Sequence, residues 1–221
     1  MRVAVVPAYQ EAATIGDTLA ALRPLVDRII VADDGSQDLT SERAASAGAV
    51  VIRRTNRGGK GAAAEAGVRA ALGLGGTVVL LADADLGSSA ASLATLLETV
   101  EADAPDAPDM AIGVLPAQPG GGFGLVRDYA ADAIEAATHW RPMAPLSGQR
   151  ALTASAVAVC LPFAPGFGLE TAMTIDALRA GLRVHEIPVS ATHRPLGRGL
   201  RGALHRARQG VQIRSALQDR R

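Results

Sequence analysis

Short apolar runs alternate with longer amphipathic stretches along the first half of the chain. Four runs rich in valine, isoleucine, leucine and alanine have the character of buried parallel strands; they cover residues 3–6, 28–32, 49–53 and 78–82. The stretches between them have helical spacing, at residues 14–25, 40–47 and 62–72. This β-α-β-α-β-α-β order predicts an α/β fold with a mostly parallel central sheet flanked by helices.

The second half has a less regular pattern. We expect helices over residues 88–101, 125–138 and 168–180, and strands over residues 110–115 and 184–189. Residues 151–161 fit either a strand or a buried helix, and residues 200–217 have the pattern of a basic helix. At 221 residues the chain is most simply one domain over 1–221, made of a first half, 1–115, and a second half, 116–221.

Two carboxylates directly follow the fourth apolar run. Asp83 and Asp85 are two residues apart, so on an extended strand their side chains would share one face and could point at one cation. The carboxyl ends of the strands are where open α/β sheets bind ligands. Two interpretations remain open for this pair, a metal site and a turn that caps the next helix together with Ser88 and Ser89.

Chemically useful side chains follow the other three runs as well. Tyr9 and Glu11 come after the first run and Asp34 after the second, while Lys60, the single lysine beside 21 arginines, follows the third. Each alone has an ordinary explanation, in the core, in a turn or in a solvated loop. Together at one sheet edge they favour a nucleotide ligand, because a ring can stack on a base and an ammonium can bind phosphate. Asp83 and Asp85 would then hold Mg²⁺ or Mn²⁺.

Composition and missing motifs exclude several classes of protein. The net charge is zero with a pI near 6.9, so no nucleic-acid partner is expected. The turn at residues 7–11 lacks the glycines of a dinucleotide-binding fold, and residues 58–61 lack the spacing of a Walker loop. Cys160 is the only cysteine, and no apolar run approaches the ~18 residues of a membrane span, so we expect a cytoplasmic protein.

Four motifs in the first 90 residues resemble, in order and spacing, the signatures of family 2 glycosyltransferases with the GT-A fold. They lie at residues 5–11, 31–38, 56–63 and 82–85. The resemblance implies that 1–115 binds a nucleotide sugar and that Asp34 reads the base, with Lys60 near the ribose or diphosphate. Asp83-Ala84-Asp85 would be the D-x-D motif, with Asp85 the more direct metal ligand and Asp83 nearer the ribose. The residues that would line the nucleoside pocket are Pro7, Ala8, Tyr9 and Glu11.

The chain as a whole resembles polyprenyl-phosphate sugar transferases and glucosyl-3-phosphoglycerate synthase-like enzymes, and its second half resembles the family less closely than the first. Residues 146–152 resemble an acceptor loop and strand, which implies acceptor contacts for Gly148, Gln149 and Arg150. Residues 167–170 resemble a segment that places an acid, here Glu170, at the start of an acceptor-side helix. Residues 193–198 resemble a loop that brings a histidine to the metal, which implies a metal role for His193 and acceptor or phosphate contacts for Arg194 and Arg198.

We therefore expect a metal-dependent glycosyltransferase that uses a nucleoside diphosphate sugar, with UDP as the nucleotide. Asp85, Lys60 and Glu170 are the candidate catalytic residues, and Glu170 is the candidate base of an inverting reaction, with an ordinary first-turn acid as the alternative. The sequence does not identify the acceptor, and a small molecule, a phosphate-bearing molecule and a lipid-linked one all stay open. Polyprenyl-phosphate mannose synthases tend to carry arginine after the fifth strand, where this chain has Val114 and Leu115. This difference argues against a lipid-phosphate acceptor, unless Arg127 or Arg150 supplies the missing positive charge.

Two other functions stay open at this level, a sugar-phosphate nucleotidyltransferase and a non-catalytic nucleotide-binding module. The arginine-rich end also has two interpretations. Its helix at 200–217 could lie on the inner, anionic face of a membrane near a lipid-linked acceptor, or it could be a solvated helix. The second is favoured, because the apolar residues form no wide stripe.

Overall fold

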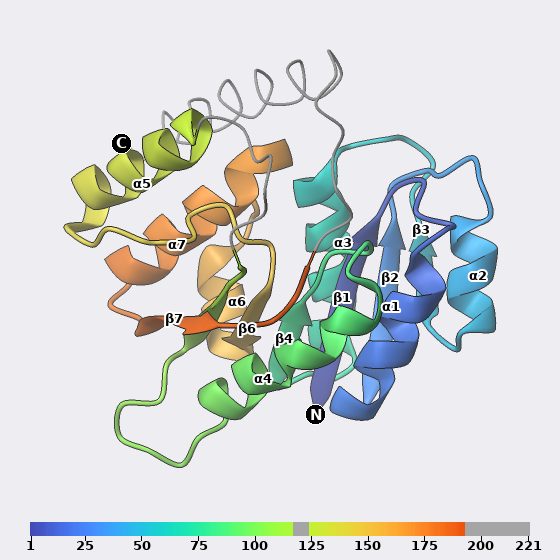
Figure 1. Cartoon of the computed structure of the whole chain (residues 1–221), viewed down its shortest axis with the longest axis horizontal. Coiled ribbons are helices and arrows are strands. Elements are labelled where there is room, and N and C mark those ends of the chain that lie inside the picture. The colour runs from blue at the N-terminus through green and yellow to red at the C-terminus, as the bar shows by residue number, and fades with distance from the viewer. Residues whose placement is uncertain (117–123, 193–221) are drawn as a thin grey trace.

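The computed structural model describes residues 1–116 and 124–192. Within these residues seven strands form one sheet, in the order β3-β2-β1-β4-β6-β5-β7 (Figure 1). The strands are β1 (Arg2–Ala8), β2 (Arg28–Asp33), β3 (Val50–Arg53), β4 (Val78–Leu81), β5 (Met110–Val114), β6 (Arg150–Thr153) and β7 (Val184–Pro188). The expected α/β class, with a mostly parallel sheet, is confirmed.

One strand runs against the others. β1, β2, β3 and β4 are parallel, and β5 pairs with β7 in parallel, whereas β6 lies antiparallel between β4 and β5. The ambiguous segment at 151–161 is both a strand and a helix, because the Thr153 side chain accepts a hydrogen bond from Ala156 N and caps the helix that follows β6. The chain thus passes directly from the middle of the sheet to its surface.

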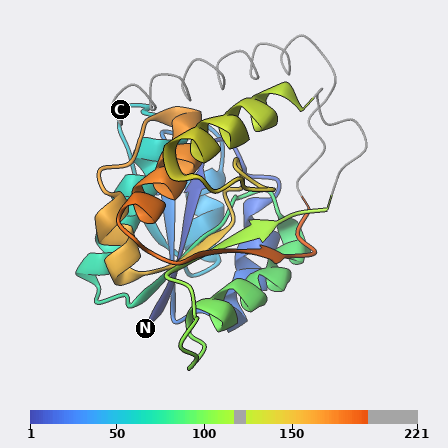
Figure 2. The same cartoon turned by 90° about the vertical axis from the view of Figure 1, so that its left-hand side faces the viewer.

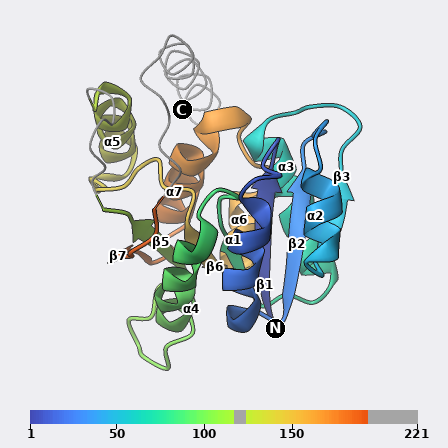
Figure 3. The ribbon, with the colours of Figure 1, turned by 45° about the vertical axis from the view of Figure 1, so that its right-hand side comes forward.

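Helices cover both faces of the sheet (Figures 1 and 3). Successive β1 residues point to opposite sides: Ala4 and Val6 join one apolar cluster, and Val3 and Val5 join the other. The first cluster is closed by α1 (Ile15–Leu22), α2 (Thr40–Ser46) and α4 (Ala94–Val100), and the second by α3 (Lys60–Gly73), α6 (Ala154–Cys160) and α7 (Leu169–Arg179). Helix α5 (Leu125–Thr138) lies beside α7 (Figure 2).

Three short 3₁₀ helices, η1 (Arg23–Leu25), η2 (Gly87–Leu93) and η3 (Gly166–Gly168), complete the elements of the described residues. The expectation of one α-helix over 88–101 is wrong in its first half. Ser89 Oγ donates to Leu86 O and Ser92 Oγ to Ser89 O, so these serines satisfy nearby carbonyls and favour the tighter 3₁₀ turn.

The third helix begins two residues before its expected start, at Lys60, which places this lysine in the first helical turn instead of the preceding loop. The predicted helix at 200–217 lies outside the described residues, as do His193, Arg194 and Arg198. Within the described part of the chain, none of the helices is both long and apolar enough to cross a membrane.

Candidate active site

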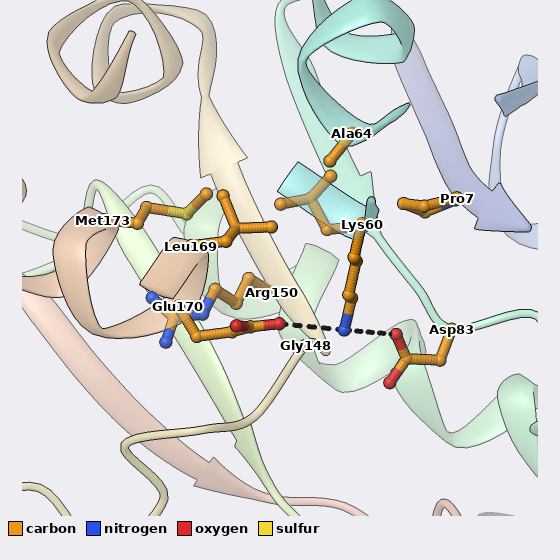
Figure 4. Close-up of a pocket in the computed structure, with 10 residues that line it drawn as sticks. Pro7, Lys60, Ala64, Asp83, Gly148, Arg150, Leu169, Glu170 and Met173 are labelled. Carbon is orange, nitrogen blue, oxygen red and sulfur yellow. Dashed lines mark ion pairs between the residues drawn. The ribbon is translucent and has the colours of Figure 1, made fainter. Parts of the chain in front are cut away.

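An ion-pair cluster lies at the carboxyl edge of the parallel strands. Lys60 Nζ is 2.6 Å from Asp83 Oδ1 and 2.8 Å from Glu170 Oε1, so one ammonium bridges two carboxylates (Figure 4). Asp83 comes from the end of β4, Lys60 from the first turn of α3, and Glu170 from the first turn of α7. The cluster therefore joins the two halves of the chain at one point.

The charge of Lys60 is fixed by its surroundings. Burial by itself would lower its pKa, but Asp83 and Glu170 outweigh burial and raise the pKa of Lys60 far above its usual value. The Lys60 side chain is a quarter exposed, whereas the Glu170 side chain is only 4% exposed. Lys60 is thus a permanent cation at any physiological pH, able to pair with phosphate and unable to act as a base.

The residues just before β6 surround Asp83. Gln149 Nε2 donates to Asp83 Oδ2 over 2.6 Å, and Asp83 N donates to Gln149 Oε1 over 3.0 Å. At Gly148 an added Cβ would lie 2.4 Å from Lys60 Nζ and 2.9 Å from Asp83 Oδ1. Glycine at 148 therefore leaves the space in which the Lys60–Asp83 pair forms.

Arg150 is a fully buried cation beneath the cluster. Its Nε donates to Ser147 O and its Nη1 to Thr174 Oγ1, each over 2.9 Å, while Nη2 has no hydrogen-bond partner among the described residues. Burial lowers the pKa of Arg150 to about 10, and the nearby carboxylate of Glu170 offsets part of that effect. No carboxylate of the described residues lies within ion-pair distance of the guanidinium. Burying this charge therefore lowers the stability of the folded protein.

The expected base-binding residues shape the loop before α3. Asp34 Oδ1 accepts from Gly58 N over 2.9 Å and Asp34 Oδ2 from Gly59 N over 2.7 Å, so this buried carboxylate fixes the turn that leads into Lys60. The guanidinium of Arg57 lies 3.8 Å from the centre of the Tyr9 ring. The loop before α3 therefore covers one face of the Tyr9 ring, which was expected to stack on the base.

The two carboxylates expected to hold a metal lie in the turn after β4. Both Asp83 oxygens are engaged, by Lys60 and by Gln149, and Asp85 lies half-buried in the same turn. Mg²⁺ keeps several waters and binds substrate phosphates, so one or two protein carboxylates satisfy it. Across residues 1–116 and 124–192, no group of three or more His, Cys, Asp and Glu side chains forms a ready metal cage.

The structure brings several predicted residues to one pocket and leaves others apart. The predicted residues that line it are Pro7, Lys60, Asp83, Gly148, Arg150 and Glu170. Ala8, Tyr9, Glu11, Asp34, Ala84, Asp85 and Gln149 are not in its lining. Glu11 instead accepts a hydrogen bond from Thr14 Oγ1 over 2.8 Å. Arg127 is also absent from the pocket lining, and it pairs with its neighbour Asp128 at the surface.

Sequence reasoning missed the apolar wall of this pocket. Leu169 and Met173, four residues apart on α7, flank Glu170, and Ala64 lies across from them (Figure 4). Leu81 also lines this pocket. The helical spacing of Leu169 and Met173 around a buried acid was visible in the sequence, but it is equally typical of ordinary core residues. Only the fold reveals that these apolar side chains desolvate the ion-pair cluster.

Comparison with known proteins is consistent with this geometry. Residues 3–163 match the family model described as Glycosyl transferase family 2. Glucosyl-3-phosphoglycerate synthase of Mycobacterium tuberculosis is 33% identical over 208 residues, covering 80% of this chain but 61% of that protein. Undecaprenyl-phosphate mannosyltransferase of Micrococcus luteus is 30% identical over 87% of this chain and 84% of that protein.

A similar solved structure is the crystal structure of the Mycobacterium tuberculosis glucosyl-3-phosphoglycerate synthase in complex with Mn²⁺, UDP and glucosyl-3-phosphoglycerate. Its TM-score is 0.77 at 28% identity, covering 98% of this chain and 80% of that chain. The similarity therefore extends over nearly the whole chain, including the second half beyond residue 163.

Proposed function

Because the chain belongs to glycosyl transferase family 2, we propose that it transfers a sugar from a UDP-sugar to an acceptor that bears a phosphate, with Mg²⁺ or Mn²⁺ as cofactor. The observation that carries the proposal is the Lys60–Asp83–Glu170 cluster, in which one cation joins the turn after β4 to the first turn of α7. The similar crystal structure contains Mn²⁺ and UDP, which supports the choice of donor and metal.

In this proposal, the donor lies along the carboxyl ends of β1, β2 and β4. Asp85 holds the cation, Asp83 lies nearer the ribose, and the Lys60 ammonium faces the diphosphate. When bound, the divalent cation neutralises charge on the departing diphosphate. Lys60 adds a second positive charge that is already oriented by two carboxylates, so little reorganisation is needed as the leaving group becomes more negative.

The acceptor side of the proposal centres on Glu170. Its carboxylate lies in the first turn of α7, where the helix dipole favours its negative charge. In an inverting transfer to a hydroxyl, Glu170 is the group that takes the proton. In a retaining transfer, or with a phosphate as the nucleophile, Glu170 orients Lys60 and the acceptor instead. Both relatives' names contain a phosphate-bearing acceptor or product, which supports a phosphate on the acceptor here.

The experiment begins with thermal-shift and calorimetric titration of UDP, GDP and their sugars, with and without Mn²⁺. We expect UDP and a UDP-sugar to bind in the presence of Mn²⁺, and GDP to bind at least tenfold more weakly. Turnover is then followed as UDP release, with 3-phosphoglycerate and a polyprenyl phosphate as separate acceptor arms. Pyrophosphate release from a nucleoside triphosphate and a sugar phosphate would instead identify a nucleotidyltransferase.

Two variants sharpen this test. Asp85→Ala should abolish UDP release at saturating Mn²⁺, whereas Asp103→Ala, which removes an exposed carboxylate, should leave it unchanged. Glu170→Gln should reduce turnover far more than UDP affinity. Wild-type turnover retained by Asp85→Ala, or no binding of any nucleoside diphosphate, contradicts the proposal.

A further inference from the structure

Gln149 makes a two-point contact with Asp83. Its Nε2 donates to Asp83 Oδ2 over 2.6 Å, and its Oε1 accepts from Asp83 N over 3.0 Å. The first bond fixes the direction of the carboxylate, and the second fixes the backbone that carries it. The Gln149 residue has 0% of its surface exposed, so its side chain reaches any ligand only through Asp83.

The sheet register explains why these two residues meet. Leu81 pairs with Arg150 in the antiparallel β4–β6 ladder, so the residues that continue past the end of β4 face those just before β6. Gln149 is held there from the other side, because its carbonyl accepts from Gly113 N over 2.8 Å. The amide group therefore stands on a backbone that β5 and β6 keep in place.

The chemistry of an amide suits this position. A carboxylate binds tightly to a neutral N–H donor, whereas a second carboxylate at the same distance would repel it. With Oδ2 taken by Gln149, Asp83 directs Oδ1 to Lys60, and Gly148 leaves the space in which they meet. The orientation of the Lys60 ammonium thus depends on Gln149 through one intermediate side chain.

We propose that Gln149 is a positioning residue of the donor site, holding Asp83 and through it Lys60, and not the acceptor contact that the family resemblance implied. The inference rests on the proposed function, since it takes UDP as the ligand that Asp83 and Lys60 serve. It makes the segment before β6 part of the machinery that binds the donor.

A double-mutant cycle on UDP affinity tests this assignment. Calorimetric titration of UDP, with Mn²⁺ and again with EDTA, is carried out on wild type, Gln149→Met, Asp83→Ala and the double variant. Gln149→Met keeps the size of the side chain without its hydrogen bonds. We expect it to weaken UDP binding about tenfold when Asp83 is present and less than twofold in the Asp83→Ala background, in both conditions.

Two controls separate positioning from loss of structure. Thr153→Ala removes the cap of α6 on the same strand segment and should lower the melting temperature without changing UDP affinity. Gln149→Glu keeps the shape but adds a charge, and it should bind UDP more weakly than Gln149→Met. Equal losses in both Asp83 backgrounds, or unchanged affinity in Gln149→Met, overturn the inference alone. Absence of UDP binding by the wild type overturns the proposed function and the inference with it.

Discussion

Replacing Arg150 by methionine is expected to leave the protein as stable as the wild type or slightly more stable. The guanidinium is fully buried, and one of its nitrogens has no partner among the described residues. Burial lowers its pKa from the usual range of arginine to about 10. Since one pKa unit corresponds to about 1.4 kcal/mol, the folded protein disfavours this charge by about 3 kcal/mol.

Three hydrogen bonds oppose that gain. Arg150 donates to Ser147 O, to Thr174 Oγ1 and, more weakly, to Met110 Sδ, and losing them costs about 2 kcal/mol. The net expectation is a free energy of unfolding about 1 kcal/mol above the wild type, because a methionine of similar length packs beside Met110 and Met173. Arg150→Ala leaves a cavity in the same place and should be about 3 kcal/mol less stable than Arg150→Met.

Urea unfolding at pH 7, with the slope m compared among the variants, measures these differences. A loss of more than about 2 kcal/mol in Arg150→Met would refute the reasoning, since it would mean that the buried charge is net stabilising. We also expect the Michaelis constant for the acceptor to rise in this variant, because a charge kept at a cost to stability is typical of a functional site.

Gly148→Ala adds a methyl group 2.4 Å from Lys60 Nζ, so it should open the Lys60–Asp83 pair. We expect weaker UDP binding in a calorimetric titration, while the free energy of unfolding falls by only about 1 kcal/mol. Burial alone would raise the pKa of Asp38, but hydrogen bonds from Thr40 and from Ala12 N outweigh it and lower that pKa below its usual 3.8. Because the folded pKa is the lower one, Asp38 stabilises the fold above about pH 4 and loses that contribution as the pH falls through the folded value. Asp38→Asn should therefore be less stable at pH 7 and show a smaller loss between pH 5 and pH 3 in urea unfolding. With Mn²⁺ present, UDP at a hundred times its dissociation constant should raise the melting temperature by about 5–10 °C. EDTA should abolish most of that rise. A rise in melting temperature that survives EDTA would argue against a bridging cation.

The strands and most helices were predictable because their signals are local. Val78–Leu81 is buried at every position, so a run of four apolar residues identifies it without knowledge of its neighbours. The positions of Asp83 and Lys60 at one sheet edge follow from the same logic, since parallel strands end on the same side. The roles of these residues stay predictions, because they concern ligands.

What the sequence did not predict depends on contacts between distant segments. Nothing in the local pattern says that β6 enters between β4 and β5 against the general direction, so the Gln149–Asp83 contact was not foreseen. The two hydrogen bonds that Asp34 accepts from loop amides were not foreseen either, because they depend on how closely that loop returns to β2, and its role at the nucleobase stays a prediction. The division of the chain into halves at residue 115 stays a prediction.

The insertion of β6 has a consequence for motion. Because β4 hydrogen-bonds to β6, and β6 to β5, the sheet is continuous from the strands of the first half to those of the second. Opening the molecule by a hinge between the halves would break these ladders, and hydrogen bonds between core strands are in general among the slowest to open. We therefore expect substrates to enter past loops at the sheet edge, and amide exchange of β4 and β6 to stay slow when donor binds.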